Sequence, residues 1–115
     1  MKITPKILES IYLTLAKCDP FLKWDLPPSE LCRFGIVDDH TVMATYEYDE
    51  SLAKQHIFSI SKARCGHYDT VVRSMAHEMI HCSRHKTGKW TLHDATFKRR
   101  KMVVGHSLGF DPLEL

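Results

Sequence analysis

The sequence has no long apolar run: nothing in its 115 residues approaches the roughly 20 apolar residues needed to cross a membrane. The residues from Met1 to Lys6 are not followed by an uninterrupted apolar stretch, so we expect no signal peptide. Internal repeats, low-complexity segments and linker-like stretches are also lacking. We therefore expect a single cytoplasmic domain, residues 1–115, that is a monomer with no membrane partner.

Closely paired cysteines are also lacking. The four cysteines are Cys18, Cys32, Cys65 and Cys82, and none forms a Cys-x-x-Cys pair. This spacing excludes a zinc ribbon and a Cys-x-x-Cys redox motif, and in a cytosolic protein it favours reduced thiols over disulfides. Cys82 directly follows His81, but neighbouring helix positions point about 100° apart. We therefore expect Cys82 to be a packing residue.

Charge and histidine are unevenly distributed along the chain. Residues 1–55 carry six Lys or Arg and nine Asp or Glu, a net charge of −3. Residues 56–115 carry ten Lys or Arg and five Asp or Glu, a net charge of +5. Five of the eight histidines fall within residues 77–106. This clustering directs the search for chemistry to the second half of the chain.

A helix and a small sheet are predicted for the first half. Thr4 can cap a helix whose first position is Pro5, and Asp19-Pro20 ends it. Apolar residues then alternate with polar ones in three short segments, and a turn is predicted at 38–40. The expected product is a small antiparallel sheet made of segments 32–36, 42–48 and 56–61, with His56, Phe58 and Ile60 on one face.

Two helices are predicted for the second half. From about Asp69 the apolar residues recur at helical spacing, and Gly88 is a natural terminator. A last helix is expected to open at Thr91, because residues 91–94 have the Ser/Thr-x-x-acid form of a helix cap, and to end near Gly105 or Gly109. The order helix, sheet, helix, helix predicts an α+β domain.

The predicted first helix of this half contains His77-Glu78-Met79-Ile80-His81, which has the form His-Glu-x-x-His. Residues four apart lie on one helix face with Cβ atoms about 5–6 Å apart, so His77 and His81 can converge on one zinc ion at about 2.0–2.1 Å. Glu78 lies beside the first ligand, where it can take a proton from a zinc-activated water. The pattern predicts one zinc per chain, with Glu78 as the catalytic base of a metallopeptidase.

A catalytic zinc needs a third protein ligand and an open fourth position. His85 is the nearest candidate, but on a continuous helix it would lie about 12 Å beyond His77. His93, at the start of the next predicted helix, can instead face the first one. We expect His93 to be the third ligand. His106 is expected at the surface, and Glu114 is a weaker carboxylate alternative.

These motifs resemble the SprT-like (Spartan-type) zinc metallopeptidases over residues 30–105. The strongest part is the His-Glu-x-x-His motif followed, after eleven residues, by His93-Asp94-Ala95-Thr96-Phe97-Lys98. The resemblance implies a zincin-like fold and a role in repairing DNA–protein crosslinks. Many members carry a four-cysteine zinc ribbon that this chain lacks, so it resembles a minimal catalytic domain. Carried over by position, the resemblance implies zinc ligands His77, His81 and His93, catalytic Glu78 and a core Phe97.

The densest run of charge follows this motif. Four consecutive basic residues surround a helix rather than line one side of it, so a solvated helix face and a phosphate-contacting patch are equal alternatives. Such contacts would add salt-dependent affinity for DNA rather than sequence specificity. The candidate DNA contacts are Lys98, Arg99, Arg100 and Lys101.

Two other functions remain open beside that of a zinc-dependent endopeptidase. A non-catalytic, zinc-containing module that binds DNA or protein would keep the metal for structure, but such a site has no use for a base at Glu78. A zinc nuclease is the other alternative. Nucleases often use two metal ions, and the sequence shows no second cluster of ligands. An endopeptidase that acts on proteins, including DNA-bound ones, is the leading hypothesis.

Overall fold

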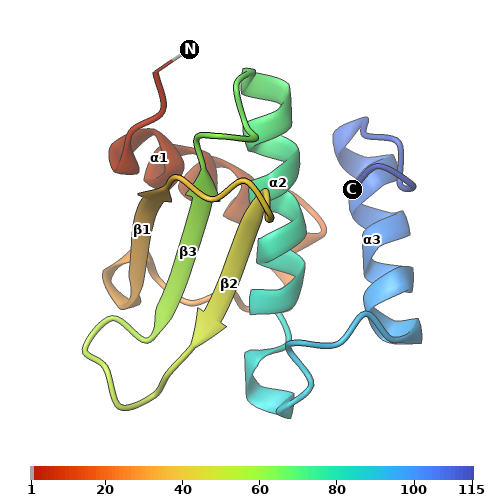
Figure 1. Cartoon of the computed structure of the whole chain (residues 1–115). Helices are drawn as coiled ribbons and strands as arrows, with labels where there is room; N and C mark the ends of the chain where they lie inside the picture. Colours follow the sequence, from red (N-terminus) through yellow and green to blue (C-terminus); the bar gives the residue numbers. More distant parts are fainter. Residues whose placement is uncertain (1) are drawn as a thin grey trace.

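A computed structural model describes residues 2–115 and has an α+β fold with three α-helices and one three-stranded sheet (Figure 1). Within these residues, no helix combines the length and the apolar character needed to cross a membrane. The predicted order of helices and strands is confirmed. The elements are α1 (Pro5–Ala16), β1 (Cys32–Val37), β2 (Ala44–Tyr48), β3 (His56–Ser61), α2 (Tyr68–Cys82) and α3 (Ala95–Leu108), with short 3₁₀ helices at Phe21–Trp24, Ser29–Leu31 and His85–Thr87.

Helix α1 begins as its sequence predicts. The Thr4 hydroxyl accepts a hydrogen bond from the Ile7 amide at 3.2 Å, and Pro5 occupies the first turn, where no amide donor is needed. The apolar side of the helix is buried against the sheet and against α2. It consists of Leu8, Ile11, Tyr12 and Leu15.

The sheet is mixed, so the prediction of an antiparallel sheet is wrong. Its strand order is β1-β3-β2, with β1 parallel and β2 antiparallel to β3. Residues 38–43 pass over the end of β3 to the far edge instead of forming a hairpin. Ser61 holds this crossing: its hydroxyl donates to the Asp39 carbonyl at 2.5 Å and its amide to the Met43 carbonyl at 2.8 Å. Alternation identifies residues that share a face, but it does not give the order of strands.

The core lies between the sheet and the helices α1 and α2. His56, Phe58 and Ile60 are buried on the inner face of β3, as predicted. The Phe58 ring lies 5.4 Å from that of Tyr12 and 5.1 Å from that of Tyr46, so aromatic contacts join α1 to β3 and β3 to β2. Helix α2 packs between β2 and α3 (Figure 1). The middle of α2 is thereby held beside the edge strand β2.

The helix boundaries around residues 82–95 differ from those predicted. Helix α2 ends at Cys82, and Gly88, with φ of 71°, ends the short 3₁₀ helix that follows. Helix α3 begins at Ala95 rather than at Thr91. Its cap is Asp94, whose carboxylate accepts a hydrogen bond from the Phe97 amide at 3.0 Å. A carboxylate is also stabilised by the positive end of the helix dipole, so Asp94 is a better cap than Thr91.

Candidate metal centre

Three histidines converge from two parts of the chain. His77 and His81 lie on the same side of α2, and His93 comes from the segment just before α3. Each offers one ring nitrogen, and these three atoms all lie within 4.8 Å of one another. The His81 Nε2 and His93 Nε2 atoms are 3.0 Å apart. Two nitrogens at zinc-binding distances in a tetrahedron are about 3.3 Å apart, so the group has the size needed for a metal ion.

The ring nitrogens are prepared for metal binding. His81 donates from Nδ1 to the Trp90 carbonyl at 2.7 Å, because a carbonyl can only accept, and this leaves a lone pair on His81 Nε2. Burial, together with the nearby His77, lowers the pKa of His81 to about 4. Burial also lowers the pKa of His77. Both imidazoles are therefore neutral near pH 7, which is the form that binds metals.

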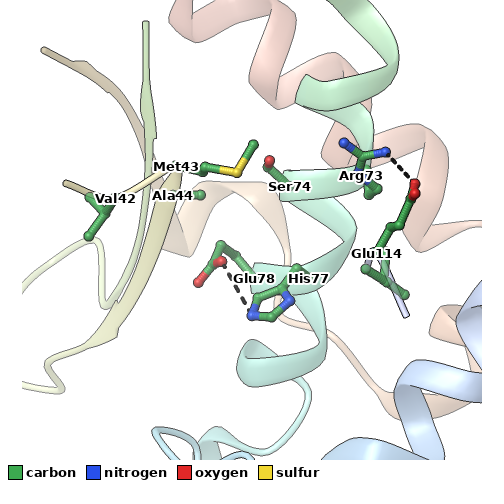
Figure 2. A pocket seen from close by; sticks show the side chains of 9 residues that line it. Val42, Met43, Ala44, Arg73, Ser74, His77, Glu78 and Glu114 are labelled. Carbon is green, nitrogen blue, oxygen red and sulfur yellow. Dashed lines mark hydrogen bonds and ion pairs between the residues drawn. The ribbon is translucent and has the colours of Figure 1, made fainter. Parts of the chain in front are cut away.

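Glu78 lies beside this group but is not part of it. Its side chain is 7% exposed, and burial raises its pKa to about 8. Figure 2 shows its carboxylate on the His77 side of α2, with Oε2 3.9 Å from His77 Nε2. A carboxyl group thus lies next to the three histidines without completing their set of ligand atoms.

The position of His93 depends on an ion pair that sequence reasoning missed. Arg84, just after α2, is 5% exposed and donates two hydrogen bonds to the Asp94 carboxylate, at 2.6 and 2.8 Å. These bonds from Arg84 hold the pKa of Asp94 at about 2. Phe97 is buried and stacks at 4.5 Å on both His81 and His93, as its predicted core role requires. Nothing in the spacing of Arg84 and Asp94 marks them as a pair.

We expect Arg84→Ala to weaken metal binding without removing a ligand. The substitution frees the start of α3 from the end of α2, so His93 is held less firmly. Loss of a partner that orients a ligand lowers metal affinity by about 10–100-fold. Arg84→Lys should recover only part of the metal affinity, because lysine cannot make the bidentate contact with the Asp94 carboxylate. Competition with a chelator measures the affinity, and unchanged zinc affinity in Arg84→Ala would contradict this role.

The metal group opens onto a cleft along β2. Two adjoining hollows share Ala44, His77 and Glu78 among the residues that line them. The first, seen from close by in Figure 2, extends to Met43 and to the Arg73–Glu114 ion pair, whose N–O distance is 3.3 Å. The second hollow extends in the other direction, past His81 and His93. It is also lined by Tyr46, Trp90 and Thr91.

The remaining candidate ligands lie elsewhere. His106 is exposed on α3, and Glu114 pairs with Arg73. His85 forms a second group of possible metal ligands with His56 and Cys82. The expectation of no second cluster is therefore wrong: His56 comes from a strand far from Cys82 in sequence, so spacing along the chain did not reveal it.

The four candidate DNA contacts differ in their surroundings. Lys98 and Arg99 are exposed on the first half of α3, and Lys101 is half-buried. Arg100 is also half-buried, with its guanidinium 4.5 Å from the centre of the Trp24 ring. It donates to the Ser83 hydroxyl at 2.6 Å as well. Arg100 thus contacts the protein itself, while Lys98 and Arg99 point to solvent.

The chain was compared with known proteins at three levels. No family model, no curated protein and no solved structure matches it.

Proposed function

We propose that this chain is a zinc-dependent endopeptidase with a zincin-like active site. The observation that carries the proposal is the convergence of His77, His81 and His93 next to the buried Glu78, in a cleft beside an edge strand. A purely structural metal site has no need of a carboxylic acid that is close to the ligands without being one. The same arrangement supports the resemblance to SprT-like metallopeptidases.

Zinc is the metal that this donor set suits best. Three neutral imidazoles are typical ligands of a catalytic zinc, and they leave one of four positions open. Magnesium and calcium prefer oxygen ligands, which the group lacks. The hydrogen bond from His81 to the Trp90 carbonyl orients the ring that would hold the ion. We propose that this centre holds one zinc ion.

In this proposal Glu78 moves the proton during peptide hydrolysis. Bound zinc would act as a Lewis acid that polarises the peptide carbonyl and acidifies the attacking water. Glu78 accepts the proton of that water at a carboxylate oxygen and then donates it to the nitrogen of the departing amine. Its burial keeps the carboxyl group away from bulk water. The positive charge of a nearby cation favours the ionised form that a base requires.

The cleft favours an extended peptide as substrate. Strand β2 lies at the edge of the sheet, so its outer side is not paired with another strand, and it lies next to α2 (Figure 1). A peptide can add to such an edge through backbone hydrogen bonds. The hollows extend to both sides of His77 and Glu78. We therefore propose cleavage within a chain rather than removal of a terminal residue.

We further propose that the substrates include proteins bound to or crosslinked with DNA. Helix α3 starts two residues after His93 and presents Lys98 and Arg99 to solvent. These side chains, with Lys101, would contact phosphates close to the metal centre. Arg100, which contacts Trp24 and Ser83, is the least suited of the four for this role. The resemblance to the SprT-like family supports the same class of substrate.

Incubating the purified chain with zinc and histones, with and without single-stranded DNA, tests the proposal. We expect fragments of histone or of the chain itself to accumulate, and we expect a zinc chelator to stop cleavage and added zinc to restore it. Stimulation by DNA would support the proposed substrate class. Binding to DNA or protein without any cleavage would instead indicate a non-catalytic module, and cleavage of the DNA would indicate a nuclease.

A further inference from the structure

A second group of metal-ligand side chains lies apart from the centre described above. It consists of His56 at the start of β3, Cys82 at the end of α2 and His85 in the 3₁₀ helix that follows. Each residue offers one ligand atom, and these atoms all lie within 4.8 Å of one another. Three separate elements thus bring two imidazoles and one thiol to a single point.

The spacing within this group fits a metal ion. The Cys82 Sγ atom lies 3.8 Å from His56 Nδ1. A sulfur at about 2.3 Å and a nitrogen at about 2.0–2.1 Å from one tetrahedral ion would be about 3.6 Å apart. The rings of His56 and His85 meet edge to face, with their centres 4.6 Å apart. Small shifts of the side chains would bring all three to bonding distance.

The surroundings orient these ligands. His85 donates from Nδ1 to the Cys82 carbonyl at 2.9 Å, which leaves a lone pair on its other nitrogen. The Tyr46 hydroxyl lies 2.7 Å from His56 Nδ1 and is a donor for either that nitrogen or a thiolate on Cys82. The Tyr48 ring lies 5.1 Å from the rings of both His56 and His85. The Tyr48 ring and the hydrogen bond of His85 therefore hold the two imidazoles in place before any ion binds. The Tyr46 hydroxyl would turn from His56 Nδ1 to the Cys82 thiolate when that nitrogen binds an ion.

We propose that His56, Cys82 and His85 form a second metal site, which takes zinc or a similarly thiophilic divalent cation. Thiolate and imidazole are the ligands that zinc prefers in structural sites. The Cys82 thiol releases its proton to solvent as the Sγ–metal bond forms, so binding becomes tighter as the pH rises. The loaded chain would then hold two ions rather than the one expected from the sequence.

The role of this site is structural. His56 is 1% exposed and Cys82 is fully buried, and only His85 is partly exposed, so the site lies mostly inside the core. The ligands join β3 to the end of α2 and to the 3₁₀ helix that lies between Arg84 and His93 in the chain. Cys82 follows His81 on α2, and neighbouring helix positions point about 100° apart. The two ions would therefore not share a ligand as in two-metal nucleases.

Cobalt distinguishes the two sites, because only the second one contains a cysteine. A thiolate bound to Co²⁺ gives a charge-transfer band in the near ultraviolet, whereas three histidines give none. When the full chain is titrated with Co²⁺, we expect this band to saturate at about one ion per chain, with a second ion bound at the three-histidine centre. The band should persist when His77 and His81 are both replaced by alanine. This result does not depend on whether the chain has peptidase activity.

Cys82→Ser should remove the band, and Cys65→Ser is the matched control because Cys65 is buried in another part of the core. His85 is partly exposed, so His85→Ala tests the site even if Cys82→Ser does not fold. We expect it to weaken cobalt binding at the thiolate site by more than the about 10–100-fold that follows loss of an orienting partner. A cobalt-saturated chain without the band, or a band that survives Cys82→Ser, would show a packing cluster instead and overturn the proposal.

Discussion

Glu78→Gln is expected to stop peptide-bond cleavage while the protein keeps its fold and its metal. Glutamine has almost the same size and keeps one carbonyl oxygen, but it cannot accept a proton from water. General-base catalysis typically contributes about 10²–10⁴-fold to the rate, and we expect the rate of cleavage to fall by at least this factor. The rate of histone cleavage measures this loss, and metal analysis of the same sample measures the zinc.

Glu9→Gln is the matched control for this change, because Glu9 is exposed on α1 and away from the cleft. It should leave both cleavage and zinc content unchanged. Binding of DNA through Lys98 and Arg99 should persist in Glu78→Gln, since those charges take no part in the proton transfer. Full activity of Glu78→Gln would remove the proposed mechanism. Loss of zinc from it would make Glu78 a structural residue and favour the binding module.

His93→Ala is expected to strip zinc from the three-histidine centre and to abolish cleavage. His93 is exposed and precedes the cap of α3, so its removal should leave the core and the helix in place. Loss of a ligand should lower affinity by more than the about 10–100-fold that follows loss of an orienting partner. Equilibrium dialysis against a zinc buffer measures the affinity, and circular dichroism checks the fold.

His106→Ala is the control for the third ligand, because His106 is exposed on the same helix. It should retain both zinc and activity. The thiolate-dependent cobalt band should also persist in His93→Ala, since that band reports the separate group around Cys82. If His93→Ala keeps its zinc while His106→Ala loses it, the group of three histidines around His81 is not the metal centre.

Local patterns predicted most of the elements that carry the candidate site. Thr4 and Pro5 marked the start of α1, and alternating residues identified the bounds of β3 and its buried face. The spacing of His77 and His81 placed two imidazoles on one helix face, because helix geometry depends on neighbours along the chain. These predictions needed no knowledge of distant contacts.

Partners that are distant along the chain could not be predicted in the same way. The strand order places β3 between β1 and β2, and the hydrogen bonds of Ser61 hold the crossing that makes this order possible. The cap of α3 is Asp94 rather than Thr91, and Arg84 donates a hydrogen bond to the Asp94 carboxylate. Each of these features depends on which surfaces meet in the folded chain.

By itself the sequence determined the helix with its His-Glu-x-x-His motif, the choice of His93 as third candidate and the α+β order of elements. Only the tertiary structure decided that three histidines meet within 4.8 Å, that Glu78 is buried beside them and that Cys82 lies against His56. The physical reason is the range of the interactions. Helical periodicity repeats every few residues, whereas burial and convergence depend on how separate elements pack together.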